Sequence, residues 1–439
     1  MDTRSSRLNN RAIFPAGVGA YGLLGAAAMN LLRLPVLSLS LLQGLALLSV
    51  TACGGSTTAT GGTATDSGTS SDSPVAESDG GDGGEATNPD LITVPLAACG
   101  PAVVYTAPVT VGGSQKFTCL VDTGSTTLGV ASSSCSNCGV KPEYTPGSSA
   151  VDEHQTASSQ FGTGSWSGEI YQDTVAMGTG ATTVKFTAIT SQSQFFQLFQ
   201  CGEVEGVIGF GPAGSELPGT NAYFDDLVAS AKIPNVFATQ LCDNGGTLWL
   251  GGYDSSATTA APQYVPMTGG FLAQGYYSVG LTSVAVNGTT IPVATAQYAD
   301  SVVDTGTSGF LLQQTAYNAL TAAIQADAAF TKVFGSSFFD TQGGNVACAA
   351  SSATKASLDA TLPALTLNFG SVAVQAAATE SYLFPYEGEA WCSSLVTDAS
   401  VSAELPIAAI IGSPILRSNI VIFDRAQKRI GFAPHTACQ

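Results

Sequence analysis

The chain has 439 residues, of which 44% are hydrophobic and only 10% charged, so it is able to bury a core of roughly two or three domains. Asp and Glu outnumber Lys and Arg by 32 to 14, and the net charge of −18 argues against a nucleic-acid partner, because so acidic a chain repels phosphate. The two histidines lie in no HExxH motif or His cluster, so we expect no metal site and no cofactor.

Residues 1–52 are predicted to be a signal peptide, because the segment is strongly apolar and ends in the letters VTAC at Cys53. This ending resembles the lipobox of bacterial lipoproteins, in which the Cys is lipidated and becomes the new N-terminus. A start at Met29 would give a leader of normal proportions. Two alternatives stay open, a transmembrane anchor and a signal that is cleaved without lipidation.

Residues 53–94 are predicted to be the lipidated Cys53 followed by a flexible tether. The tether is made of Gly, Ser, Thr, Asp and Glu and has too few large apolar residues to order itself. Gly54 stands where an Asp often retains lipoproteins at the inner membrane. We therefore expect a bacterial cell-envelope protein with an N-terminal lipid anchor, attached to the outer membrane and facing the periplasm or the exterior. A secreted protein is the alternative.

The remaining residues are predicted to be mostly β, with an N-terminal lobe at 95–239 and a C-terminal lobe at 240–439. Few charges, much Gly and abundant Ser, Thr and Val favour short strands and tight turns. The spacing of Ala and Leu predicts helices at 223–231 and 314–327.

Two segments of the globular part repeat. Each has an apolar run, then Asp-Thr-Gly at Asp122 or Asp304, then a second apolar run. Much later in each half comes an apolar-apolar-Gly signal, ending at Gly209 and Gly412. One Asp-x-Gly alone indicates a β-turn, but two copies in matching frames indicate a duplicated site.

Two such loops face to face would bring two carboxylates about one water apart. Gly124 and Gly306 would let the loop backbones approach closely. Two charges so close cannot both ionise, so the pair would hold one proton over a broad acid range. The ionised member would take a proton from a water and the protonated member would donate to a peptide carbonyl.

In this order the motifs resemble the pepsin-like aspartic peptidases, from about Tyr105 to Cys438. Further matches are FGTGSWSG from Phe161, which resembles the family's flap hairpin, and LWLGGYDSS from Leu248. The resemblance implies an all-β, bilobal acid protease fold with two duplicated lobes, a cleft between them and a few short helices. It also implies an aspartic endopeptidase that works as a monomer on peptide or protein substrates.

Asp122 and Asp304 would then be catalytic, and the flanking residues would support them. By resemblance, the threonines after each Asp lock the loops together, and the hydroxyls after each Gly bond the outer carboxylate oxygens. The support residues are Thr123, Gly124, Ser125, Thr305, Gly306 and Thr307. The expected flap and apolar subsite are Phe161, Gly162, Thr163, Leu120 and Val207, which would favour large apolar side chains beside the scissile bond.

The chain departs from the family pattern at the flap and before the first lobe. Phe161 stands where the family has Tyr, and Gly129 stands where many members have Trp. Trp166 is a candidate to fill the vacated space. Residues 54–95 contain no Lys or Arg, unlike the basic pro-segment of pepsin-like zymogens.

Ten cysteines favour an oxidising compartment. The resemblance implies disulfides between Cys135 and Cys138 and between Cys348 and Cys392. The alternative for the first pair is half of a metal site, but no second CxxC completes it. The cysteines that remain cannot be paired from sequence, and at least one of them is expected to be free: Cys99, Cys119, Cys201, Cys242 and Cys438.

Two other functional classes stay open. A catalytically silent binding or inhibitor protein with the same fold usually loses an Asp or distorts the loop after it, whereas both loops are intact here. A structural surface lipoprotein would need neither Asp122 nor Asp304.

The lipobox interpretation predicts that Cys53→Ser releases soluble protein, because the acyl chains that hold the protein in the membrane are lost. Membrane fractionation of cells that express either form measures this. A variant that still sediments with the membranes would favour a transmembrane anchor.

Overall fold

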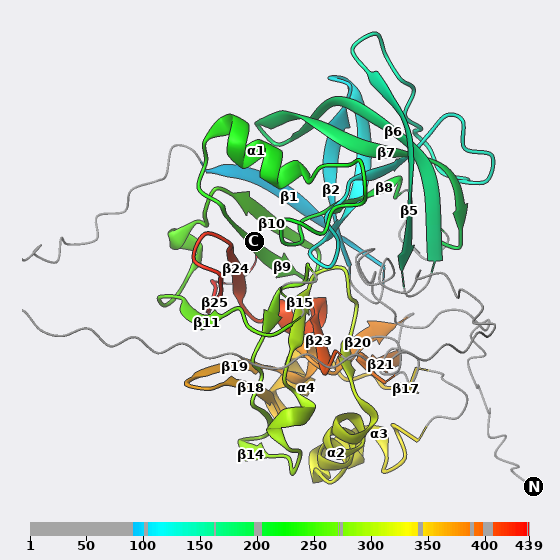
Figure 1. Ribbon diagram of the computed structural model, residues 1–439. Helices are drawn as coiled ribbons and strands as arrows, with labels where there is room; N and C mark the ends of the chain where they lie inside the picture. The colour runs from blue at the N-terminus through cyan, green and yellow to red at the C-terminus, as the bar shows by residue number, and fades with distance from the viewer. Residues whose placement is uncertain are drawn as a thin grey trace, which may run out of the picture. The chain divides into compact units, whose positions relative to one another are not determined.

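The computed structural model describes residues 91–100, 104–161, 164–196, 204–270, 272, 275–340, 346–386, 390–397, 407–436 and 438 (Figure 1). Met29 and Cys53, with the predicted signal peptide and most of the tether, lie outside the described residues. All described residues belong to one compact unit. None of the helices within these ranges is both long and apolar enough to cross a membrane.

The described chain is mostly β, as predicted, and its largest sheet has thirteen strands. In sheet order these are β11 (Gln263–Pro266), β25 (Arg429–Ala433), β24 (Ile420–Asp424), β9 (Val236–Cys242), β10 (Gly245–Leu250), β1 (Ile92–Cys99), β2 (Val104–Val111), β3 (Gln115–Asp122), β8 (Gly206–Gly209), β4 (Gly129–Ala131), β7 (Gly180–Ser193), β6 (Gly164–Met177) and β5 (Val151–Phe161).

Three smaller sheets come from the C-terminal half. The five-stranded sheet has the order β12 (Ser278–Val279), β15 (Ser301–Asp304), β23 (Ala409–Gly412), β16 (Phe310–Leu312) and β22 (Leu395–Val396). The four-stranded sheet has β14 (Thr289–Thr290), β13 (Ser283–Val286), β18 (Leu365–Phe369) and β19 (Val372–Ala376). The three-stranded sheet has β17 (Cys348–Ala350), β21 (Ala390–Ser393) and β20 (Leu383–Tyr386).

The two predicted lobes share the large sheet. β9 pairs with β10 on one side and with β24, near the end of the chain, on the other. The predicted boundary between 239 and 240 therefore falls inside a strand. β1 begins at Ile92, within the range predicted as tether, because Ile92 and Val94 are buried in the core.

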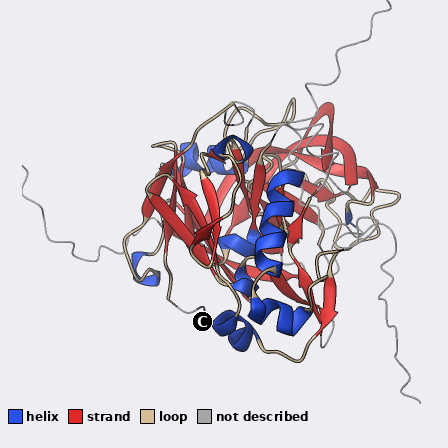
Figure 2. Cartoon of the chain, turned by 90° about the horizontal axis from the view of Figure 1, so that it is seen from below, coloured by secondary structure: helices blue, strands red, loops and turns tan. Residues whose placement is uncertain are grey.

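The described helices are short and few, and Figure 2 shows them in blue against the more abundant red strands. They are α1 (Tyr223–Ala231), α2 (Gln314–Gln325), α3 (Ala328–Phe334), α4 (Lys355–Thr361) and α6 (Ser413–Leu416). The helix predicted at 223–231 is confirmed. The one predicted at 314–327 ends at Gln325, because the Asp327 side chain accepts a hydrogen bond from the Phe330 amide and caps α3 instead.

An aromatic core joins the shared sheet to the first Asp loop. Phe237 in β9 stacks on Phe423 in β24 with ring centroids 4.6 Å apart, and Phe210 packs on Phe237 at 5.2 Å. Phe210 directly follows the Gly209 that ends β8. β8, the strand that faces the first Asp loop, is therefore held through Phe237 in the middle of the chain to Phe423 near its C-terminus.

The described chain contains the disulfides Cys135–Cys138 and Cys348–Cys392, and also Cys242–Cys438, which no sequence signal paired. Cys119 is free and buried, and Cys99 is disulfide-bonded. Cys201 lies outside the described residues.

Candidate active site

The Asp of each repeated motif is the last residue of a strand, one strand from each half of the chain. Asp122 ends β3, which runs parallel to β8, and lies opposite Gly209. Asp304 ends β15, which runs parallel to β23, and lies opposite Gly412. The apolar runs before each Asp are buried, so each strand is fixed by the core and delivers its last side chain to the site. The two halves thus use the same construction.

Each loop turns on a glycine that lies against the other half's carboxylate. A Cβ on Gly124 would lie 2.9 Å from the Asp304 carboxyl atoms, and one on Gly306 would lie 2.3 Å from Asp122 Oδ1. Real Cβ atoms do not come so close to other heavy atoms. Only glycine therefore allows the two loops to bring their carboxylates together.

Each carboxylate receives two hydrogen bonds from its own loop. The Gly124 amide donates to Asp122 Oδ1 at 2.9 Å and the Ser125 hydroxyl to Oδ2 at 2.5 Å. In the second loop, the Gly306 amide donates to Asp304 Oδ1 at 2.8 Å and Thr307 Oγ1 to Oδ2 at 2.6 Å. These bonds fix the plane of each carboxyl group and leave the pair facing each other.

Two threonines lock the loops across the pair. Thr305 Oγ1 accepts from the Thr123 amide at 3.2 Å and donates to the Val121 carbonyl at 2.8 Å. Reciprocally, Thr123 Oγ1 accepts from the Thr305 amide at 3.0 Å and donates to the Val303 carbonyl at 3.3 Å. The support residues expected from the sequence are thus brought together around the dyad.

Burial raises the pKa of both carboxyl groups. Asp122 is 0% exposed and Asp304 1% exposed, so loss of solvation is the largest cause in both. The charge of Asp304 raises the pKa of Asp122 further, while the Thr307 hydroxyl and the Gly306 amide oppose the rise at Asp304. A buried pair of this kind keeps one proton, which makes one member an acid and the other a base.

Phe161, the first predicted flap residue, ends β5 and is paired with Gly164 at the start of β6. It packs on Phe195 with ring centroids 5.2 Å apart. The structure places it in one buried apolar cluster with Leu120 and Val207, the two predicted subsite residues. Gly162 and Thr163 lie outside the described residues.

Trp166 occupies the space beside Gly129. A Cβ on Gly129 would lie 3.2 Å from Trp166 Cζ2, so the indole lies on the glycine. Trp166 is buried and its ring centroid is 6.2 Å from that of Phe161. The indole therefore reaches this place from the flap strand β6 rather than from the loop after Asp122.

Sequence reasoning missed two residues that hold the Asp loops. Ser413 donates from Oγ to the Thr305 carbonyl at 2.7 Å and from its amide to the Thr307 carbonyl at 2.8 Å. Its place directly after the second apolar-apolar-Gly motif could have indicated it. Tyr277 donates its hydroxyl to the Phe210 carbonyl at 2.6 Å, a contact between the halves that no local pattern predicts.

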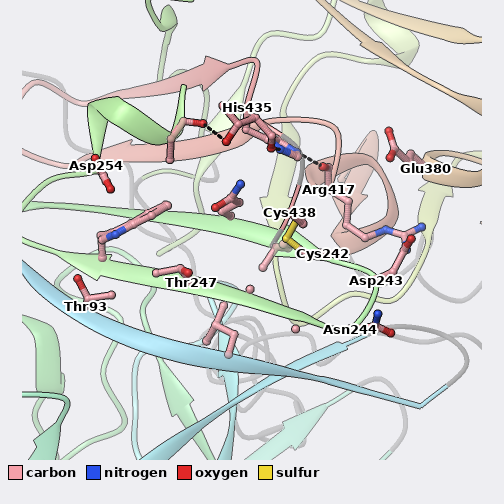
Figure 3. A pocket seen from close by; sticks show the side chains of 18 of the residues that line it. Thr93, Cys242, Asp243, Asn244, Thr247, Asp254, Glu380, Arg417, His435 and Cys438 are labelled. Carbon is pink, nitrogen blue, oxygen red and sulfur yellow. Dashed lines mark hydrogen bonds and ion pairs between the residues drawn. A yellow bond between two sulfur atoms is a disulfide. The ribbon is translucent and has the colours of Figure 1, made fainter. Parts of the chain in front are cut away.

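A separate cavity of about 890 Å³ contains neither Asp122 nor Asp304. Figure 3 shows Asp243 beside Arg417 and the Cys242–Cys438 disulfide at its wall. Arg417 and Lys355 both pair with Asp243, at 2.8 and 2.6 Å, so these charges satisfy one another. Among the described residues, no group of three or more His, Cys, Asp or Glu side chains is arranged to hold a metal ion.

Comparison with known proteins agrees with this geometry. The family model described as eukaryotic aspartyl protease matches residues 104–435. An aspartic protease of Phaffia rhodozyma is 35% identical over 54% of this chain, a match that spans only 58% of the relative's length. A beta-secretase of Strongylocentrotus purpuratus is 27% identical over 77% of this chain and 68% of its own length. Pepsin-2B of Gadus morhua is 29% identical over 73% of this chain and 92% of its own length.

The close approach of the loops predicts that Gly306→Ala abolishes hydrolysis of peptides. The new methyl group would push Asp122 away, and a misplaced reacting group costs about a hundredfold or more in rate. Gly147→Ala is the control, because nothing lies within 4 Å of its Cβ. Peptide hydrolysis by the two purified variants measures the difference, and equal rates would contradict the assigned loop geometry.

Proposed function

The chain belongs to the eukaryotic aspartyl protease family, and from this membership we propose that it is an endopeptidase that hydrolyses peptide bonds at acid pH. The observation that carries the proposal is the buried pair Asp122 and Asp304, each held by an amide and a hydroxyl of its own loop. A silent binding protein would need neither the pair nor its shared proton.

The reaction follows from the state of the pair. With one proton between them, the ionised carboxylate takes a proton from a water placed between the two groups, and the resulting hydroxide attacks the peptide carbonyl carbon. The protonated carboxyl donates to the carbonyl oxygen, so a neutral tetrahedral diol forms. The carboxyl that took the proton from the water then donates it to the leaving nitrogen, while the other carboxylate takes a proton from one diol hydroxyl. The C–N bond breaks to give an amine and a carboxylic acid, and the pair again holds one proton.

We propose a preference for large apolar side chains beside the scissile bond. The support is the apolar cluster that Phe161 forms with Leu120 and Val207, next to the first Asp loop. Side chains of this kind gain most from contact with such a wall.

We further propose that the protein acts as a monomeric, outer-membrane lipoprotein of a bacterial cell envelope, or in secreted form. The VTAC motif at Cys53 and the acidic, Gly- and Ser-rich segment after it support the anchor and the spacer. The disulfides support an oxidising compartment.

Asp122→Asn and Asp304→Asn are each expected to reduce kcat by about 10³-fold or more, since neither carboxamide can share the proton. The double variant should lose no more than either single one, because the two groups act as a unit. In the native protein, peptide hydrolysis should be bell-shaped in pH with its maximum on the acid side. Cleavage that survives either substitution would rule out the dyad mechanism.

The same pair predicts how stability changes with pH. Both folded-state pKa values are raised, so the folded protein binds its protons more tightly than the unfolded chain does. This stabilisation is complete below the unfolded pKa of about 3.9 and is lost as pH rises through the folded values. Asp122→Asn should therefore lose less free energy of unfolding between acid and neutral pH than the native protein, as measured by urea titration. An identical loss would show that the pair does not share a proton.

The flap assignment predicts that Phe161→Ala lowers kcat/KM for apolar peptides by about tenfold, because the ring wall of the subsite is lost. Phe161→Tyr should change it little, since the ring remains. Steady-state kinetics on one peptide series measures both, and unchanged kinetics for Phe161→Ala would remove Phe161 from the substrate site.

A further inference from the structure

Three buried polar atoms below the flap have no hydrogen-bond partner within the described part of the chain. They are Ser159 Oγ, Trp166 Nε1 and Gln192 Oε1. The three residues are 5%, 3% and 8% exposed. Buried polar groups are almost always hydrogen-bonded, so three such atoms in one region need a common explanation.

The three residues lie in one row across the flap sheet. Ser159 in β5 is paired directly with Trp166 in β6, and Trp166 is paired directly with Gln192 in β7. Directly paired residues of antiparallel strands point to the same face, with Cβ atoms about 4.5–5.5 Å apart. Because all three are buried, this is the inner face of the sheet, the face that also carries Phe161.

Asn137 fixes the orientation of the Gln192 amide. Gln192 Nε2 donates to the backbone carbonyl of Asn137 at 2.7 Å, and the backbone N–H of Gln192 donates to Asn137 Oδ1 at 3.1 Å. In return, Asn137 Nδ2 donates to the backbone carbonyl of Gln192 at 2.7 Å. Because Nε2 bonds Asn137, Oε1 is the Gln192 side-chain atom that has no partner. β7 lies between β4 and β6 in the sheet, and β6 carries Trp166.

The three free atoms have complementary roles. Trp166 Nε1 is a donor only, Gln192 Oε1 is an acceptor only, and the Ser159 hydroxyl is both. One water can accept from the indole, donate to the amide oxygen and exchange a third bond with the hydroxyl, which is the usual number for a buried water. We propose that a single buried water binds between Ser159, Trp166 and Gln192, and that Trp166 and Gln192 are positioning residues that hold the flap through it.

This water ties the flap to a rigid part of the N-terminal half. Trp166 follows Gly164, where β6 leaves the flap, by two residues. Gln192 is bound to Asn137, which lies inside the four-residue ring closed by the Cys135–Cys138 disulfide. The connection therefore runs from the disulfide ring through β7 and the water to β6. The positioning role rests on the proposed function, whereas the water site does not.

Two substitutions at Gln192 separate the water bridge from simple packing. Gln192→Leu keeps the volume but removes both the acceptor and the Nε2 bond to Asn137, and we expect kcat/KM for an apolar peptide to fall about tenfold, mainly through KM. Gln192→Glu, when protonated, offers an O–H to Asn137 and a carbonyl oxygen to the water, so it should match the native protein at pH 3. As its carboxyl ionises, the ratio of variant to native kcat/KM should fall. Gln160→Leu, on the exposed face of β5, is the matched control.

A crystal structure of the folded protein at a resolution that shows ordered waters tests the site without relying on activity. The expected result is one water within 3.2 Å of all three atoms in the native protein and its loss in Gln192→Leu. A direct bond from Trp166 Nε1 to Gln192 Oε1, with no water, would overturn the proposal. So would a Gln192→Glu ratio that does not change with pH. If the native protein cleaves no peptide at any pH, the proposed function fails and the crystal structure alone decides the water site.

Discussion

Two carboxylates buried beside each other are the constraint on which the rest of the structure depends. Asp122 and Asp304 are almost fully buried, and two negative charges so close together in the protein interior would repel each other strongly. The arrangement is stable only if one proton is shared and if each remaining lone pair is hydrogen-bonded. The glycines let the two loops approach each other, and the hydroxyls donate hydrogen bonds to the outer carboxylate oxygens, so both serve this requirement.

The same requirement explains why the two halves are joined so firmly. A shift of the halves by even a fraction of an ångström would separate the pair or force it together. Each threonine of the lock donates to a carbonyl of the opposite loop, and Tyr277 bonds the Phe210 carbonyl from the other half. The shared sheet through β9 and β24 and the disulfide Cys242–Cys438 hold the same join at a distance from the site. Local geometry at the dyad is thus maintained by contacts between residues far apart in sequence.

Much of the site could be predicted from sequence because its determinants are local. A strand, a tight loop and an apolar-apolar-Gly partner each occupy a few consecutive residues, and the duplication doubles the signal. The helix at 223–231 was equally local. The Cys242–Cys438 disulfide, the Tyr277 contact and the row beginning at Ser159 depend on tertiary pairing, which no single segment encodes. The Ala and Leu spacing predicts a helix that continues to Asp327, whereas α2 ends at Gln325 and the Asp327 side chain caps α3.

The flap shows why departures from a family pattern have to be interpreted together. Phe161 without its hydroxyl and Gly129 without an indole look like two losses when each is taken alone. The structure shows that the space beside Gly129 is filled by Trp166, and a Cβ at position 129 would lie only 3.2 Å from the indole. A large side chain at 129 would therefore compete for the space that Trp166 occupies, and glycine leaves that space to the indole. Phe161 offers no hydroxyl, and the indole N–H has no protein partner among the described residues. The water that we propose between Ser159, Trp166 and Gln192 supplies that partner.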